Sequence, residues 1–174
     1  MAWVLQAPRA TGALILAASL AVLGAAFGFQ YLAAIEPCPL CIYQRYPYAI
    51  TIGLSAVALA LAGRPPLAGA YFVPALTALC AAAFAAGAGI AAYHVGVEQG
   101  WFQASEACTA TAFEATDIDD LRAQLEATPV ARCDQVAWSL FGVSLAGLNL
   151  IASAALAGLS FAAAARQLAK ASHR

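Results

Sequence analysis

The chain has 174 residues, of which 63% are hydrophobic and 10% are charged, and its net charge is −1. Soluble domains are typically about 45–50% apolar and about 25% charged, so this composition excludes an ordinary soluble domain. The chain also lacks the basic face that a nucleic-acid-binding protein needs. Its length allows one compact domain. We predict an all-α fold, an integral membrane four-helix bundle that forms a single domain over residues 1–174.

Four stretches of at least about 18 residues carry no charged side chain. About 18 residues is the length that a helix needs to cross a bilayer. These stretches are residues 10–35, 46–63, 65–97 and 135–165. They show little of the alternation that marks a barrel strand, so we expect helices. The membrane spans are predicted at about residues 11–34, 39–61, 67–93 and 136–163.

The first stretch has the features of a membrane span rather than those of a cleaved signal peptide. Its apolar run is well beyond the about 7–15 residues of a signal-peptide core, and its weakly basic start has Arg9 alone. Its removal would also leave an odd number of spans. We therefore expect this segment to belong to the bundle.

Charged residues divide between the two ends of such a bundle. Basic residues lie near the N-terminus, between the second and third spans and in the tail: Arg9, Arg64, Arg166, Lys170 and Arg174. Because Lys and Arg mark cytoplasmic segments, both termini are predicted to be cytoplasmic in a bacterial inner membrane, with the two connections at the other end periplasmic. All nine acidic residues fall on the predicted periplasmic side.

The first outer connection enters the second span through Cys38, Pro39, Leu40 and Cys41. Proline suits the first position of a helix, so Cys38 is expected at the N-cap and Cys41 in the first turn. The positive end of the helix dipole favours a thiolate there, and the Cys-X-X-Cys spacing also lowers thiol pKa values. Arg45 follows Cys41 by four residues, on the same helix face, where its guanidinium favours the thiolate and can bind a carbonyl or anionic ring oxygen.

The long outer loop, residues 94–134, carries a second pair of cysteines, Cys108 and Cys133. Within this loop, Asp117–Thr128 shows the three- and four-residue apolar spacing of a short amphipathic helix. Such a helix is expected either on the membrane surface or packed on the loop itself.

Two further residues of the third span carry chemistry. Cys80 lies alone inside the span, where a free cysteine is expected to act as a small buried apolar side chain. His94 closes the span on its outer side, with Glu98 four residues further on. It is either a polar tip at the membrane interface or a hydrogen-bond donor to the headgroup of a ligand.

The close cysteine pair has two other interpretations. A zinc site needs four nitrogen or sulfur ligands, which the two loop cysteines would have to complete. Those cysteines form no second close-spaced knuckle, and Arg45 disfavours a divalent cation beside it, so redox chemistry without a metal is favoured. A purely structural disulfide between Cys38 and Cys41 would constrain very little chain.

Residues 38–45 read Cys-Pro-Leu-Cys-Ile-Tyr-Gln-Arg, which resembles the signature of the DsbB family of quinone-linked disulfide-bond formation proteins. The layout is similar as well, with four spans, one redox pair at the start of the second span and another pair in the second outer loop. The resemblance implies a quinone-dependent protein-disulfide oxidoreductase. It would re-oxidise a periplasmic thioredoxin-fold oxidase of the DsbA type and pass the electrons to ubiquinone or menaquinone as a cosubstrate.

The resemblance also implies a role for each site residue. Cys108 is expected to form a mixed disulfide with the oxidase, and Cys133 is then expected to pair transiently with Cys38. Cys41 is expected to face the quinone ring as a thiolate donor. Arg45 and His94 are expected on the quinone side of the site. A partner poised near about −120 mV needs an acceptor that is more oxidising still, which a quinone in the bilayer supplies.

Other classes of protein remain as alternatives. A specialised paralogue that serves one substrate would share these motifs, since Cys80 has no role in the scheme and the loop can select its own partner. A vitamin K epoxide reductase-like enzyme also combines a helix bundle with Cys-X-X-Cys and a quinone, but there the loop pair precedes the motif. A non-enzymatic metal-binding membrane protein would want Met, His or carboxylates inside its spans, and the one Met is Met1. A structural subunit would make the thiols dispensable.

Overall fold

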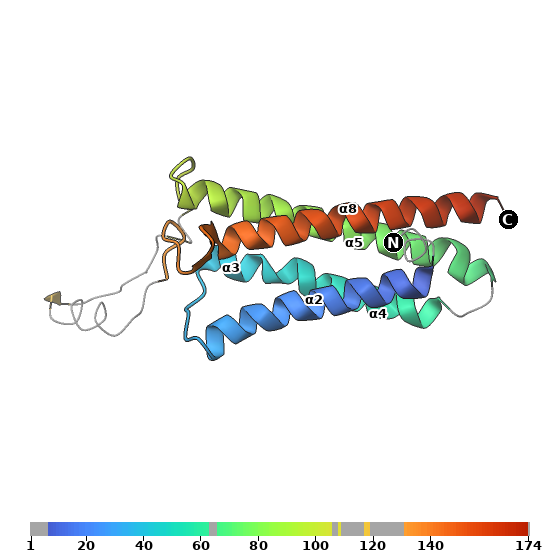
Figure 1. Cartoon of the computed structure of the whole chain (residues 1–174), viewed down its shortest axis with the longest axis horizontal. Coiled ribbons are helices and arrows are strands. Elements are labelled where there is room, and N and C mark those ends of the chain that lie inside the picture. The colour runs from blue at the N-terminus through green and yellow to red at the C-terminus, as the bar shows by residue number, and fades with distance from the viewer. Residues whose placement is uncertain (1–6, 63–65, 106–107, 109–116, 119–130, 174) are drawn as a thin grey trace.

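The computed structural model describes residues 7–62, 66–105, 108, 117–118 and 131–173. These residues are mostly helical, and the helices are α2 (Pro8–Tyr31), α3 (Pro39–Tyr43), α4 (Arg45–Leu61), α5 (Pro66–Glu98) and α8 (Leu145–Ser172). The helices lie side by side along the long axis of the molecule, with α3 running on into α4 (Figure 1). Three segments are long and apolar enough to cross a membrane, namely α2, residues 71–98 of α5, and α8. The structure therefore fits a membrane protein.

The helices pack through small and aromatic side chains. α5 packs along α8, and α4 packs against both α2 and α5, whereas α2 and α8 make few direct contacts. One buried cluster joins Ile15, Tyr48, Cys80 and Phe84. The rings of Tyr48 and Phe84 meet edge to face with their centroids 5.8 Å apart, an arrangement that aromatic quadrupoles favour. This cluster holds α2, α4 and α5 together beneath the site.

The second predicted span, residues 39–61, is made of two helical segments, α3 and α4, that follow one another directly. α3 ends before Gln44, which is the residue that separates it from α4. Pro47 explains the interruption, because proline has no N–H for the carbonyl one turn earlier and its ring crowds that carbonyl. Proline is tolerated in the first turn of a helix, which is where α4 contains it. The predicted second span therefore contains a local irregularity at Gln44, which keeps helical dihedral angles and a backbone hydrogen bond to Leu40.

The first predicted span, residues 11–34, is displaced toward the N-terminus. α2 already begins at Pro8, since a proline at the first helical position loses no hydrogen bond. The helix ends at Tyr31, and Ala34 just beyond it has a φ of 51°, which a right-handed helix cannot continue.

The third predicted span, residues 67–93, ends too early. α5 continues as far as Glu98, because Val97 is buried and gives the additional turn an apolar contact. The predicted outer loop, residues 94–134, therefore begins with helix, and His94 lies within α5 rather than after it.

The fourth predicted span, residues 136–163, starts too early. Two short antiparallel strands, β1 (Ser139–Leu140) and β2 (Val143–Ser144), form a hairpin there, and α8 begins only after it. Phe141 and Gly142 make the turn with φ values of 51° and 82°, as in the tight turns that match the twist of a hairpin. Periodicity alone cannot distinguish a short apolar strand from part of a buried helix. The sequence analysis therefore counted the residues of this hairpin as the start of the fourth span.

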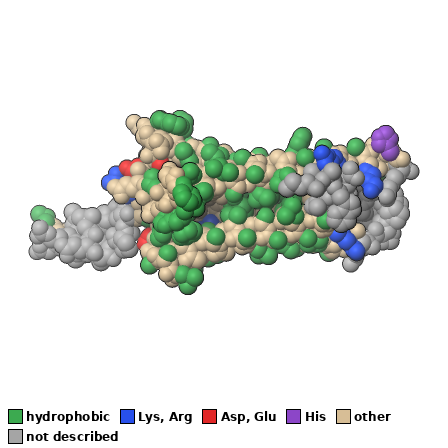
Figure 2. All heavy atoms as spheres, in the orientation of Figure 1, with side chains coloured by type: hydrophobic (Ala, Val, Ile, Leu, Met, Phe, Trp, Pro, Cys, Tyr) green, Lys and Arg blue, Asp and Glu red, His purple; other side chains and the backbone are tan. Residues whose placement is uncertain are grey.

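The two ends of the bundle differ in charge. Lys and Arg side chains gather where α2 begins and α8 ends (Figure 2), and those among the described residues are Arg9, Arg166 and Lys170. We call the opposite end the cysteine end, because it holds Cys38, Cys41, Cys108 and Cys133. The predicted amphipathic helix, Asp117–Thr128, lies outside the described residues except for its first two positions.

Candidate functional site

The start of α3 brings Cys38 and Cys41 together. Pro39 opens the helix, and Cys38 is the N-cap in the extended conformation that this position requires. The Sγ of Cys38 accepts a hydrogen bond from the backbone N–H of Cys41 at 3.3 Å, and the two sulfur atoms are 3.1 Å apart. The predicted places of Cys38 at the N-cap and Cys41 in the first turn are thus confirmed.

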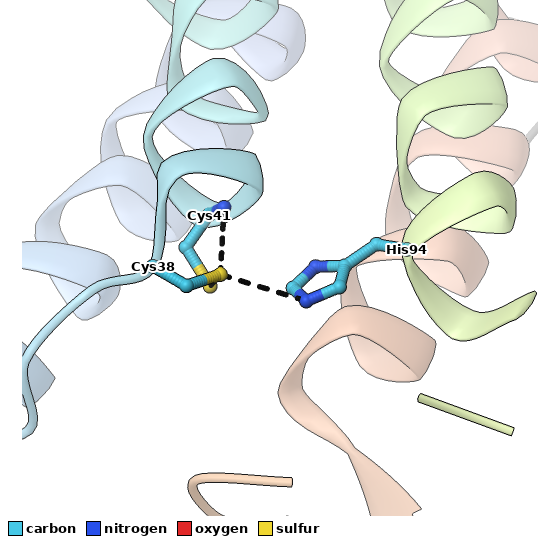
Figure 3. Close-up of side chains that lie close together, drawn as sticks. All are labelled: Cys38, Cys41 and His94. Carbon is cyan, nitrogen blue, oxygen red and sulfur yellow. Dashed lines mark hydrogen bonds between the residues drawn. The ribbon is translucent and has the colours of Figure 1, made fainter. Parts of the chain in front are cut away.

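His94 faces this pair from α5 (Figure 3). Its Nε2 lies 3.6 Å from the Sγ of Cys38 and 4.0 Å from the Oε1 of Glu98. The other carboxylate oxygen of Glu98 accepts a hydrogen bond from Ser144, whose hydroxyl also caps α8. Because His94 is only 2% exposed, its hydrogen-bond partners rather than water decide where its protons lie.

These contacts favour the ionised form of Cys38. The hydrogen bond with the Cys41 side chain, opposed by burial and aided by His94 and the Cys41 backbone, lowers the pKa of the Cys38 thiol to about 4. In the reduced pair the donors therefore gather on Cys38, whereas the sequence directed attention to Cys41. The sequence analysis instead placed the thiolate at Cys41, and that assignment stays a prediction.

The second pair of cysteines is buried against the first. Cys108 and Cys133 form a disulfide with their Cα atoms 5.6 Å apart. Both belong to one buried cluster with Cys38, Leu40 and Val97. The structure therefore brings the two predicted pairs together, although a long stretch of chain separates them.

A cavity of about 490 Å³ lies beside the first pair, walled by α2, the junction of α3 and α4, and α8. Much of its lining is apolar and includes Leu23, Phe29, Trp138 and Leu148. Its polar lining includes Cys38, Cys41, Gln44, Arg45, His94 and Asn149. Trp138, which precedes the hairpin, packs on Phe29 with the ring centroids 5.0 Å apart. The cavity thus combines an apolar wall with sulfur, amide, guanidinium and imidazole groups.

Arg45 is held at the edge of this cavity by α2. Its Nη1 donates to the Oε1 of Gln30 at 2.6 Å, and its guanidinium carbon lies 5.0 Å from the centroid of the Phe27 ring. In the part of the chain that the structure describes, the ion pairs within 4.0 Å are His94–Glu98 and Arg132–Asp134, and Arg45 is in neither. A guanidinium has several N–H donors, so Arg45 retains donors for an oxygen atom in the cavity.

A buried chain of hydrogen bonds runs from His94 to α8. The Nε2 of Gln44 is 2.8 Å from the Nδ1 of His94, and the Nδ2 of Asn149 donates to the Oε1 of Gln44 at 2.6 Å. The hydroxyl of Tyr48 donates to the Oδ1 of Asn149 at 2.6 Å and lies 2.8 Å from the hydroxyl of Ser153. The sequence analysis gave no role to Gln44 or Asn149. The available signal was an isolated amide in an apolar span, which is costly in lipid without a partner.

Known proteins resemble the chain along most of its length. The family model described as Disulfide bond formation protein DsbB matches residues 8–163. The chain belongs to the DsbB family. Disulfide bond formation protein B 1 of Pseudomonas aeruginosa is 32% identical over 160 residues, which are 90% of this chain and 94% of the relative.

Two further relatives extend this comparison. Disulfide bond formation protein B of an Acidovorax species is 32% identical over 160 residues, covering 86% of this chain and 83% of the relative. An uncharacterized protein of Rickettsia prowazekii is 25% identical over 135 residues, covering 76% and 74%. No solved structure matches the chain significantly. Membership of the DsbB family agrees with the resemblance that the motif at residues 38–45 carries.

The predicted site residues fall into two groups in this DsbB family member. Those that line the cavity are Cys38, Cys41, Arg45 and His94. The other two, Cys108 and Cys133, are joined in the disulfide that packs beside Cys38. Cys80 has no assigned role and lies apart as a buried free thiol in the core cluster, as expected. The chemical role of each residue stays a prediction.

Proposed function

We propose that this DsbB family member is a membrane thiol:quinone oxidoreductase. It oxidises the dithiol of a periplasmic thioredoxin-fold oxidase of the DsbA type to a disulfide and reduces ubiquinone or menaquinone to the hydroquinone. The electron pair and both protons that the thiols lose equal those that the quinone gains, so the reaction balances without a metal. Family membership supports the disulfide chemistry, and the need for an acceptor more oxidising than the partner supports a quinone.

The lining of the cavity suits a quinone. The apolar side chains of Phe29 and Leu148 match a flat ring, Arg45 offers N–H donors to a ring carbonyl oxygen, and His94 lies on the same cavity wall. The cavity volume of about 490 Å³ lies within the about 300–1,000 Å³ of small-molecule sites. A bound quinone would act as the electron acceptor, and the protein would bind and orient it beside Cys41.

We assign successive exchange steps to the two cysteine pairs. A thiolate of the partner attacks Cys108, which breaks the Cys108–Cys133 bond and releases Cys133 as a thiolate. Cys133 then attacks Cys38 of an oxidised Cys38–Cys41 pair, which releases Cys41 as a thiolate. The shared burial of Cys133 and Cys38 supports this exchange, and the position of Cys41 on the cavity wall supports its role as the last thiol of the relay.

We further propose that the chain spans the membrane four times. α3 and α4 together cover residues 39–61, which at 1.5 Å per residue give about 35 Å, enough for the about 30 Å hydrocarbon core. The basic residues at the end where α2 begins and α8 ends support cytoplasmic termini. The cysteine end then faces the periplasm, where disulfides form.

The single observation that carries this proposal is that Cys41, Arg45 and His94 share one cavity next to Cys38. The test is quinone reduction by the purified protein in detergent, followed by absorbance, with a reduced DsbA-like oxidase as electron donor. Turnover is expected in the wild type and in Cys80→Ala, and its loss is expected in Cys41→Ser and Cys108→Ser. The absence of turnover with either quinone, from protein with all four outer cysteines intact, would overturn the proposal. A panel of thioredoxin-fold donors separates a general oxidase partner from a specialised one.

A metal site is the second candidate, because one observation favours it. A ligand atom from each of Cys38, Cys41 and His94 lies within 4.8 Å of the others. A structural zinc site has four protein ligands, and this group supplies three among the described residues. Zinc or copper bound at one ion per chain, and lost in Cys38→Ser, would support this candidate over the redox relay.

A further inference from the structure

Two hydroxyls anchor one end of the buried hydrogen-bond chain. Tyr48 and Ser153 are 2% and 0% exposed, and their oxygen atoms are 2.8 Å apart. One hydrogen bond between them uses only one of their two protons, so the other proton needs a second acceptor. The Oδ1 of Asn149 lies 2.6 Å from the Tyr48 hydroxyl and 3.5 Å from that of Ser153. Because a buried hydroxyl without an acceptor is costly, the pair turns the oxygen of Asn149 toward itself.

The orientation of Asn149 passes along the chain to His94. With its oxygen facing the hydroxyls, Asn149 presents its Nδ2 to the Oε1 of Gln44 at 2.6 Å. Gln44 must then direct its own N–H donors toward the Nδ1 of His94, which lies 2.8 Å away. A nitrogen that faces a donor has to offer its lone pair, so the proton of the neutral imidazole lies on Nε2.

The protonated nitrogen points at the reactive pair. The Nε2 of His94 is 3.6 Å from the Sγ of Cys38, which already accepts from the Cys41 backbone at 3.3 Å. Among the described residues, Cys41 and Glu98 also lie near His94, and Glu98 accepts a hydrogen bond from Ser144, the N-cap of α8. Thiolates, not thiols, perform disulfide exchange, and a second N–H donor favours a thiolate at Cys38.

We propose that Gln44 and Asn149 are positioning residues that hold His94 in the neutral Nε2–H tautomer, so that His94 donates to the sulfur of Cys38. This inference rests on the proposed thiol:quinone function and names the residues that stabilise Cys38 as a thiolate once exchange has released it from its disulfide. Gln44 lies between α3 and α4, and its side chain contacts both His94 on α5 and Asn149 on α8.

The test reads the His94 tautomer directly by nitrogen-15 NMR in detergent. The chain has two histidines, so labelled histidine gives two sets of ring signals, and His173→Gln assigns them. In the reduced wild type, Nδ1 of His94 is expected to be unprotonated and Nε2 protonated. In Gln44→Glu, a carboxylate replaces the donor that faces Nδ1, and the Nδ1 signal is expected to shift to the protonated range.

A second variant tests whether the effect passes through Gln44. Asn149→Asp, at a pH that ionises the new carboxyl, offers only acceptors, so Gln44 must turn its oxygen toward His94. The same Nδ1 shift is expected, although Asn149 does not touch His94, and the shift is expected to disappear in a Gln44→Leu background. A thermal midpoint in detergent equal to that of the wild type controls for misfolding.

Two results would overturn the inference: a protonated Nδ1 in the neutral His94 of the wild type, or no shift in Asn149→Asp. Quinone turnover is measured on the same samples. A wild type that turns over quinone but fails the tautomer test refutes this inference alone. A wild type without turnover refutes the proposed function, whatever the tautomer.

Discussion

The two buried thiols Cys38 and Cys80 differ in their neighbours far more than in their burial. They are 4% and 1% exposed, and each packs in an apolar cluster. Cys38 stands at the N-cap of α3, where a backbone N–H and the ring of His94 reach its sulfur. Cys80 lies inside α5, where the backbone N–H groups are used within the helix, and its neighbours include Phe84.

This comparison indicates that the place of a cysteine along its helix, and not its burial, decides whether hydrogen-bond donors reach its sulfur. The first N–H groups of a helix have no intrahelical acceptor, so a sulfur at the N-cap can receive one of them. A sulfur in the middle of a helix has no such N–H within reach, and Cys80 is buried in the core cluster as a small side chain. We therefore expect the reactive sulfur at the cysteine end and an inert one in the core cluster.

The largest effect is expected when a sulfur of the reactive pair is lost. Cys41→Ser removes the thiol that lines the cavity and should abolish quinone reduction, because a hydroxyl cannot form or release a disulfide. The measurement is the quinone absorbance with a reduced DsbA-like donor, and Cys80→Ala is the matched control that should keep its turnover. Wild-type turnover in Cys41→Ser would remove the distinction between the two regions.

Cys38 should also differ from an ordinary thiol in how its alkylation rate depends on pH. The Cys38 pKa of about 4 lies below the about 8.5 of an ordinary thiol, so its thiolate persists on acidification until the pH falls through about 4. Alkylation of Cys38, located by mass spectrometry, should therefore change little between about pH 8 and pH 5. An ordinary thiol would lose about tenfold per pH unit over much of that range.

His94→Leu provides the control for this pH profile. It removes one donor to Cys38, so the Cys38 pKa should rise and the alkylation rate should begin to fall at a higher pH. A wild-type rate that already falls steeply just below pH 8 would contradict a reactive thiolate at Cys38.

A smaller and more specific effect is expected from Arg45. Arg45→His removes a charged donor at the cavity edge, and the loss of a charge-assisted hydrogen bond should raise the apparent quinone KM about tenfold or more. The KM for the protein donor should stay unchanged, since that donor meets the other cysteine pair. Gln30→Leu keeps the guanidinium but removes the hydrogen bond that holds it. This variant should raise the quinone KM less than Arg45→His does. An unchanged quinone KM in Arg45→His would refute a role in quinone binding.

Local rules predicted the reactive turn from the sequence, whereas long-range contacts were beyond them. The places of Cys38 and Cys41 follow from Pro39 and from the N-cap preference of one turn, which needs no tertiary information. The contact between Gln44 and Asn149 joins residues 105 positions apart, and no local spacing indicates it. Local spacing therefore predicted the cysteines of the site but gave no indication of Gln44 and Asn149, the amides that we propose to orient His94.

The errors in the spans have a different cause. Counting uncharged residues finds membrane-length segments but cannot see where hydrogen bonding is interrupted. Pro47 makes the second span locally irregular, and the turn at Phe141 and Gly142 makes a hairpin of residues counted as the fourth. In both places the interruption lies at the cysteine end and supplies part of the cavity wall, including Arg45 and Trp138.

The smallest functional effect, and the sharpest contrast, is expected at Cys80. Cys80→Ser introduces a hydroxyl into the core cluster and should lower the free energy of unfolding by about 1–3 kcal/mol, because the group is buried among apolar side chains. Quinone turnover at a temperature where the variant is folded should equal that of the wild type. Cys38→Ser should show the reverse, with turnover lost and a thermal midpoint in detergent close to the wild type, because serine is itself a favoured N-cap. If Cys80→Ser lost turnover while fully folded, Cys80 would belong to the electron path, and helix position would no longer explain which buried thiol reacts.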